Sequence, residues 1–206
     1  HVTRDNVLLA FHDASLDRVT DQRGTIAKLD YDQVRCARVG GREPVPLLED
    51  LLGAFPSARI NIDPKSDAAV GPLIDVIRRT RAEARVCIGS FNGNRLKRVR
   101  QALPGICTSM ARAESARARF ASLGWPWRGG GAACAQVPVW WNGILIVDRR
   151  FVGAMHARAI PVHVWTVNEV SEMNRLLDLG VDGLMTDYPA RLKAVLEARG
   201  LWCSAP

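Results

Sequence analysis

The chain has no long apolar segment, no paired cysteine motif and no initiating methionine. No apolar run in its 206 residues approaches the ~20 residues that a transmembrane helix requires. The opening segment, His1 to Asp5, lacks the apolar core of a signal peptide. Five cysteines without a Cys-x-x-Cys pair argue against a disulfide framework or a zinc knuckle and favour a reducing compartment. We therefore expect a cytoplasmic protein without a transmembrane segment.

Lysine is also scarce, because 24 of the 28 basic residues are arginine. The formal net charge is +7, but the basic residues are scattered, and the densest cluster, Arg78 to Arg85, follows an apolar-periodic stretch typical of a helix. This distribution predicts ordinary surface charge and no nucleic-acid partner. Hydrophobic residues make up 48% of the chain, which is enough for a sizeable core.

Short apolar or β-branched runs recur along the chain, with starts 21 to 29 residues apart. Helical periodicity fills most of the intervals, as at Val70 to Thr80 and Met173 to Leu177. This alternation predicts a parallel sheet covered by helices. The six predicted strands are Arg59–Pro64, Arg85–Phe91, Ile106–Met110, Ala135–Trp140, Pro161–Val167 and Gly183–Pro189.

The arrangement of polar residues favours a closed (β/α)₈ barrel over an open sheet. No Gly-x-Gly-x-x-Gly turn follows a predicted strand, whereas polar residues stand at the carboxyl ends of several strands, where barrel enzymes build their active sites. A barrel usually needs ~250 residues and eight repeats. We count six repeats and a hairpin-like opening, His1 to Asp13. The expectation is one barrel domain over residues 1–206, without its first βα unit and part of its second strand.

Three side chains are candidates for chemistry. His12 ends the opening segment, and a histidine there can act as a general acid or base, or it can merely cap the strand. Asp63 and Lys65 are two apart on a strand and point to one face. Such a pair can bind a metal and an anionic oxygen, or it can be a structural salt bridge. By contrast, we expect His156 to be structural.

A loop with two tryptophans, Trp125-Pro-Trp127, leaves two interpretations open: it covers the mouth of the barrel, or it packs under its own loop. Gly129 to Gly131 has no Lys-Ser/Thr after it and predicts a loop without a phosphate-binding role.

Six motifs in register together resemble the glycerophosphodiester phosphodiesterase family, over nearly the whole chain. They are Phe11-His-Asp13 with Leu16-Asp-Arg-Val-Thr20, Pro44–Asp50, Ile60-Asn-Ile-Asp-Pro-Lys65, Gly89–Asn92, Val164-Trp-Thr-Val-Asn168 and Gly180–Pro189.

The resemblance implies a barrel enzyme that hydrolyses glycerophosphodiesters to glycerol 3-phosphate and an alcohol, with one divalent cation, Mg²⁺ or Ca²⁺. It gives His12 the role of general acid, Asp63 that of a metal ligand and Lys65 that of a phosphate-binding catalytic residue. We expect Phe91, Gln136 and Trp165 to be the substrate-binding residues.

The sequence departs from the family pattern in two ways. Asp63 stands where glutamate is more usual, and the family's His-Arg-Gly motif and Glu-x-Asp metal pair are absent. We therefore expect this chain to be a truncated form that is nearly inactive, and its open barrel edge to favour a homodimer. The alternatives are a catalytically decayed barrel that only binds, and a lysophospholipase D-like or phosphoinositide-cleaving phosphodiesterase with Trp125-Pro-Trp127 as a membrane-touching lip.

Overall fold

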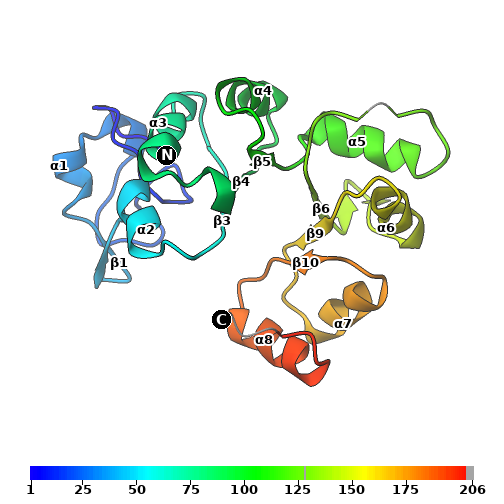
Figure 1. Cartoon of the computed structure of the whole chain (residues 1–206). Helices are drawn as coiled ribbons and strands as arrows, with labels where there is room; N and C mark the ends of the chain where they lie inside the picture. The colour runs from blue at the N-terminus through cyan, green and yellow to red at the C-terminus, as the bar shows by residue number, and fades with distance from the viewer. Residues whose placement is uncertain (128, 203–206) are drawn as a thin grey trace. The chain divides into compact units, whose positions relative to one another are not determined.

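A computed structural model describes residues 1–127 and 129–202 and shows a chain of alternating strands and helices (Figure 1). The contacts divide it into two compact units, His1–Thr108 and Ser109–Pro206. Each unit contains a three-stranded parallel sheet, ordered β3-β4-β5 in the first and β10-β9-β6 in the second. The predicted parallel α/β organisation is thus present in both units.

The first unit contains the regular elements α1 (Tyr31–Val34), β1 (Arg38–Val39), β2 (Glu43–Pro44), α2 (Leu48–Ala54), β3 (Ile60–Ile62), α3 (Val70–Thr80), β4 (Val86–Ile88), α4 (Gly93–Ala102) and β5 (Cys107–Thr108), with 3₁₀ turns η1 (Ile26–Lys28) and η2 (Glu83–Arg85). Helix α3 forms where the apolar periodicity predicts it, since Leu73 and Ile77 are buried on one side. It ends at Arg81, whose φ of 50° is left-handed.

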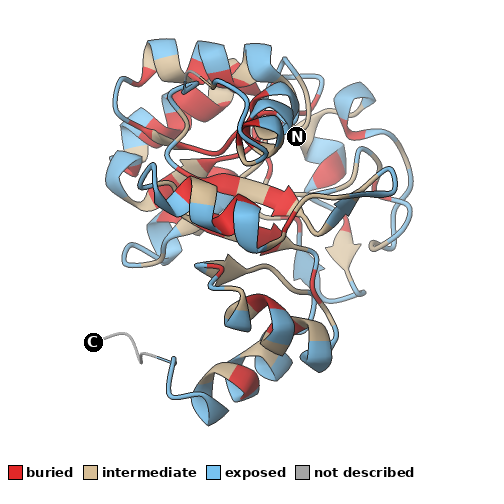
Figure 2. Ribbon diagram, turned by 90° about the vertical axis from the view of Figure 1, so that its right-hand side faces the viewer, coloured by how far each residue is buried: buried red, intermediate tan, exposed pale blue. Residues whose placement is uncertain are grey.

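The second unit contains α5 (Arg112–Ala121), β6 (Ala135–Pro138), β7 (Trp140–Trp141), β8 (Ile144–Leu145), α6 (Arg149–His156), β9 (Val162–Trp165), α7 (Val170–Asp178), β10 (Gly183–Leu184) and α8 (Pro189–Ala198). The Asp148 side chain caps α6 by accepting a hydrogen bond from the amide of Phe151 at 2.8 Å. Phe151 and Met155 then bury the inner side of α6, and Met173 and Leu176 do the same for α7. Figure 2 shows this pattern as buried stripes on helices whose other sides are exposed.

Residues along the strands alternate between two environments. In β6 and β9 the valines are buried, and the residues between them are partly exposed. The register pairs Gln136 with His163 and Pro138 with Trp165, so these four side chains share the less buried face of the sheet. His163 and Trp165 of β9 therefore lie on one face of the sheet.

One expectation about local structure is confirmed and another needs correction. The predicted hairpin at residues 1–13 is present as an antiparallel bridge between Val2 and Leu8, with the amide of Thr3 donating to the carbonyl of Val7 at 3.0 Å and the amide of Leu9 to that of His1 at 2.8 Å; Leu9 also bridges to Leu47. The predicted strand Ala135–Trp140 ends at Pro138, because a separate β-hairpin, β7–β8, begins at Trp140. None of the described helices is long and apolar enough to cross a bilayer.

Candidate active site

His12 stands at the end of a backbone segment that is tied to two neighbours. The amide of Leu9 donates to the carbonyl of His1 at 2.8 Å, and the amide of Ala10 donates to that of Pro46 at 2.9 Å. Leu9 is buried in a core cluster, whereas the His12 side chain is 78% exposed. The fold therefore fixes the backbone up to His12 and leaves its imidazole accessible to a ligand.

The His12 ring is oriented by a carboxylate that an arginine also holds. The Asp13 carboxylate lies 2.8 Å from His12 Nδ1, and it accepts hydrogen bonds from Arg18 Nε at 2.6 Å and Arg18 Nη2 at 3.0 Å. These hydrogen bonds, from Arg18 first and His12 second, hold the pKa of Asp13 well below its ordinary value. An ionised Asp13 favours the tautomer with hydrogen on Nδ1, so Nε2 is left for exchange with a substrate.

Buried Leu16 places Arg18 against Asp13. Its side chain is 1% exposed in the same core cluster as Leu9, and its amide donates to the carbonyl of Gly24 at 3.0 Å. The segment Leu16–Thr20 belongs to a family motif, but the sequence alone predicts no role for Asp13 or Arg18. An ion pair five residues apart in a non-helical segment has no simple periodic signal.

Asp63 and Lys65 follow β3 at its carboxyl end. Pro64 between them has no amide hydrogen, so the parallel ladder with β4 ends at Ile62. Lys65 Nζ donates to Asp63 Oδ2 at 2.8 Å, and the two side chains are 28% and 33% exposed. The predicted proximity of the carboxylate and the ammonium group is present, and both remain open to solvent on one side.

One pocket of the first unit brings the three candidate residues together. It has a volume of ≈ 330 Å³, and His12, Asp63 and Lys65 all line it, with Phe11 and Leu9 among the apolar residues of its wall. That volume is within the range of small-ligand sites. A second pocket of ≈ 310 Å³, beside Arg79 and Glu49, contains no histidine. The geometry therefore favours the His12 pocket as the candidate active site.

The three predicted substrate-binding residues lie outside the lining of this pocket. Phe91 follows β4 and is 53% exposed. Gln136 and Trp165 lie on adjacent strands of the second unit and share its less buried face. Their role in substrate binding stays a prediction.

Asp63 is the only carboxylate of the predicted metal site that the described residues supply. Among them, it belongs to no group of three or more His, Cys, Asp or Glu side chains whose ligand atoms lie within 4.8 Å of one another. Mg²⁺ and Ca²⁺ take six or more oxygen ligands, so one aspartate does not make a site by itself. The carboxylate chemistry suits such a cation, but the ligand number in this chain does not.

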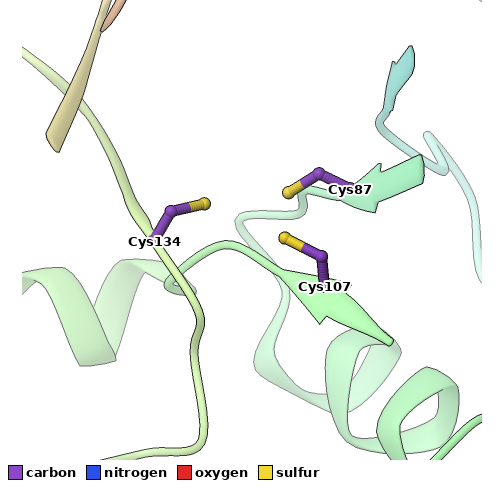
Figure 3. Close-up of side chains that lie close together, drawn as sticks. All are labelled: Cys87, Cys107 and Cys134. Carbon is purple, nitrogen blue, oxygen red and sulfur yellow. The ribbon is translucent and has the colours of Figure 1, made fainter. Parts of the chain in front are cut away.

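Two thiols of the first unit face each other across neighbouring strands, a feature that sequence spacing did not predict. Cys87 of β4 and Cys107 of β5 are register partners, and their Sγ atoms lie on the same side of the sheet within 4.8 Å (Figure 3). The described cysteines form no disulfide, as expected, and Cys203 lies outside the described residues. Thiol groups are soft ligands, so this pair does not replace the missing oxygen ligands of a Mg²⁺ or Ca²⁺ site.

The motifs at the ends of β9 and β10 have a structural function in the second unit. Asn168 Oδ1 accepts hydrogen bonds from Thr186 Oγ1 at 3.1 Å and from the amide of Asp187 at 3.0 Å. Asn168 Nδ2 donates to Asp187 Oδ2 at 2.9 Å. These contacts connect the segments that follow the two strands.

The two tryptophans of the Trp125-Pro-Trp127 loop differ. Trp127 packs against the core of the second unit and lies under Arg158, whereas Trp125 is 68% exposed beside Phe120. The loop follows α5 and precedes β6, so it lies at the amino end of β6. The packing of Trp127 favours the interpretation that the tryptophans pack under their own loop, and a cover of the barrel mouth stays a prediction.

Known proteins resemble this chain in sequence and in fold. The model of the "Glycerophosphoryl diester phosphodiesterase family" matches residues 1–191. The chain is 37% identical over 209 residues to "Probable glycerophosphodiester phosphodiesterase 2" of Mycobacterium tuberculosis, covering 98% of this chain and 79% of that protein. It is 25% identical over 234 residues to a lysophospholipase D of Homo sapiens, GDPD1, covering 95% of this chain and 74% of the relative.

A solved structure shows the same fold. It is that of an Oleispira antarctica phosphodiesterase in complex with the product sn-glycerol-3-phosphate. The TM-score is 0.77 at 19% identity, with 95% of this chain and 82% of the other covered. The predicted α/β barrel class is thereby confirmed.

Proposed function

This chain belongs to the glycerophosphoryl diester phosphodiesterase family, and on that premise we propose that it hydrolyses glycerophosphodiesters to glycerol 3-phosphate and an alcohol. The observation that carries the proposal is the single pocket lined by His12, Asp63 and Lys65. A phosphodiester needs positive charge beside its phosphate oxygens and a proton for the oxygen that leaves. The pocket offers a group for each need.

His12 is the general acid of this proposal. With Nδ1 directed at Asp13, the protonated ring donates from Nε2 to the oxygen of the departing alcohol as the P–O bond breaks. The negative Asp13 stabilises the protonated ring before transfer, and Arg18 fixes Asp13 from the other side. Asp13 and Arg18 are therefore positioning residues.

Lys65 is the phosphate-binding group, and Asp63 offsets part of the positive charge of the Lys65 ammonium group. In the ion pair the ammonium group is partly neutralised, so a bound phosphate must compete with Asp63 for Lys65. A divalent cation at Asp63 would supply charge stabilisation at the phosphate, and oxygen ligands favour Mg²⁺ or Ca²⁺. Among the described residues Asp63 is the one carboxylate that lines the pocket, so the steps of the proposal depend on the side chains of the chain itself.

The proposal includes a difference in activity between chain lengths. The 206 residues contain neither a His-Arg-Gly motif nor a Glu-x-Asp pair. We expect this chain to release product far more slowly than a gene product that carries both, because catalytic groups that act as a unit are not additive. A homodimer through an exposed strand edge, such as that of β3 at the end of its sheet, also belongs to the proposal.

The test measures glycerol 3-phosphate release from glycerophosphocholine by a gene product that carries both motifs, with EDTA and then with added Mg²⁺ or Ca²⁺. His12→Ala should lower the rate by about 10²- to 10⁴-fold. The matched control is His156→Ala, which removes an exposed histidine that pairs with Asp182 in the second unit. Equal rates for the two variants would contradict the role of His12.

Calorimetric titration with sn-glycerol 3-phosphate tests the pocket of the 206-residue chain without catalysis. Lys65→Met should weaken binding by about tenfold or more, because it removes a charge-assisted hydrogen bond. Asp63→Asn should abolish any enhancement of binding by Mg²⁺ or Ca²⁺. Product binding without turnover by a gene product that carries both motifs would favour the decayed, binding-only barrel.

A further inference from the structure

The second unit presents an apolar β-hairpin to solvent at the carboxyl end of β6. It consists of β7 and β8, and its four strand residues are Trp140, Trp141, Ile144 and Leu145. The two turn residues, Asn142 and Gly143, have φ values of 47° and 79°. Two positive φ values in a two-residue loop are typical of the tight turn that Asn-Gly favours, so the hairpin is a regular one.

Each face of this hairpin carries an exposed apolar side chain. Trp140 pairs with Leu145 and Trp141 with Ile144, and paired residues point to the same face. Trp140 is 60% exposed on one face, and Ile144 is 58% exposed on the other. Neighbouring exposed apolar side chains on a short protruding segment mark an interaction site more often than isolated ones do.

Contacts with α5 hold the hairpin in place. Arg119 Nε of α5 donates to the Leu145 carbonyl at 3.0 Å, and the guanidinium carbon of Arg112 lies 5.0 Å from the centroid of the Trp141 ring system. The amide of Ile146 closes the base of the hairpin by donating to Val139 at 2.8 Å. The exposure of the apolar side chains is therefore part of a fixed structure.

The hairpin directly follows the carboxyl end of a strand of the parallel sheet. Its first residue comes two positions after the end of β6, and the carboxyl ends of strands form the substrate-binding edge of a barrel. Exposed arginines begin the helices before and after the hairpin in the chain: Arg112 begins α5, and Arg149 and Arg150, four and five positions after Leu145, begin α6. Apolar indoles flanked by cations match the boundary between acyl chains and anionic headgroups of a lipid layer.

We propose that the hairpin Trp140–Leu145 docks this chain on the surface of anionic lipid membranes. Trp140 and Ile144 enter the acyl boundary, and Arg112, Arg149 and Arg150 contact the headgroups. A second copy of the chain is a poorer occupant, because a two-fold contact would bring like-charged arginines together. The membrane contact stands on this geometry alone; the further inference that it delivers lipid diesters to the enzyme rests on the proposed function.

Cosedimentation with vesicles tests the contact. The chain is mixed with phosphatidylcholine vesicles, with or without phosphatidylglycerol, and the bound fraction is measured. The double variant Trp140→Ser with Ile144→Ser should lose about tenfold or more in partition to the anionic vesicles, since two large apolar side chains are removed. Changing Arg149 and Arg150 to Gln should reduce the preference for anionic over zwitterionic vesicles.

The matched control is Trp125→Ser with Phe120→Ser, which removes 68% and 58% exposed aromatics at the amino end of β6. This variant should bind vesicles as the unchanged chain does. Equal losses in both double variants, or no vesicle binding by the unchanged chain, would overturn the proposal. The proposal would also be overturned if the hairpin variant lost self-association in light scattering but kept its vesicle binding.

The same variants separate this inference from the proposed function. In a gene product that carries both motifs, the hairpin variant should hydrolyse soluble glycerophosphocholine at the unchanged rate and lose rate only on vesicle-bound lysolipid. Vesicle binding without hydrolysis of any diester would leave the membrane contact standing and refute the enzymatic proposal. Loss of rate on both substrates would refute the assignment of the hairpin to membrane contact alone.

Discussion

Replacing Gly183 of β10 by alanine should lower the stability of the second unit, and the size of the loss should depend on His163. The two residues are register partners on adjacent strands. A Cβ atom on Gly183 would lie 2.9 Å from Cδ2 and 3.4 Å from Cγ of the His163 ring. Carbon atoms prefer a separation of about 3.5–4.0 Å, so Gly183→Ala forces the ring or the strand to move.

The size of the effect follows from two opposing contributions. Overpacking of this kind costs about 1–3 kcal/mol. Replacing glycine by alanine returns about 0.4–1 kcal/mol, because the unfolded chain has fewer conformations to lose. We expect Gly183→Ala to lower the free energy of unfolding of the second unit by about 1–2 kcal/mol. In a His163→Ala background, the same change should be neutral or stabilising.

Urea unfolding of the unchanged chain, the two single variants and the double variant gives the coupling free energy between Gly183 and His163. Hydrogen exchange of the β9 and β10 amides shows whether the change in stability lies in these strands. Gly153→Ala is the control, because a Cβ at Gly153 in α6 would have no atom within 4 Å; it should stabilise the chain by about 0.5–1 kcal/mol. Additive effects of the Gly183 and His163 changes would refute the reasoning.

Three further outcomes are expected. Burial lowers the pKa of His163 below its ordinary 6.5, so the unfolded chain takes up a proton at higher pH than the folded chain does. The stability of the fold should therefore decline as the pH falls below 6.5. Thermal unfolding curves recorded across that range should show a smaller decline for His163→Gln. Arg18→Ala should raise the pKa of Asp13 towards its ordinary value, as measured by carboxyl ¹³C NMR, and an unchanged titration would contradict the ion pair. Exposed Cys36 should react with iodoacetamide before buried Cys134, with mass spectrometry as the readout; equal rates would contradict the burial.

The positions of the parallel strands could be predicted from the sequence because each is a short apolar run with helical periodicity after it. All six runs contain a strand of the structure, and α3 matches Val70–Thr80. Strand ends were less predictable, since Ala135–Trp140 reads as one apolar run. The Asn142-Gly143 dipeptide was the available signal that this run is followed by a tight hairpin.

The candidate site could be predicted only in part. His12, Asp63 and Lys65 were found because each stands at the end of a recognisable strand or motif. The support of His12 by Asp13 and Arg18 depends on an irregular segment whose course is set by the burial of Leu16, and no periodicity describes such a segment. The Cys87 and Cys107 pair depends on strand register, which the 19 intervening residues conceal.

The division into two units has a consequence for spectroscopy. All six tryptophans lie at positions 125–202, within the second unit, and the first unit has none. Each unit also has a core cluster of its own, around Leu16 in the first and Phe151 in the second. Tryptophan fluorescence therefore reports the unfolding of one unit, whereas circular dichroism reports helices in both. If the units melt separately, the two signals will give different midpoints, and the difference measures how cooperatively the two units unfold.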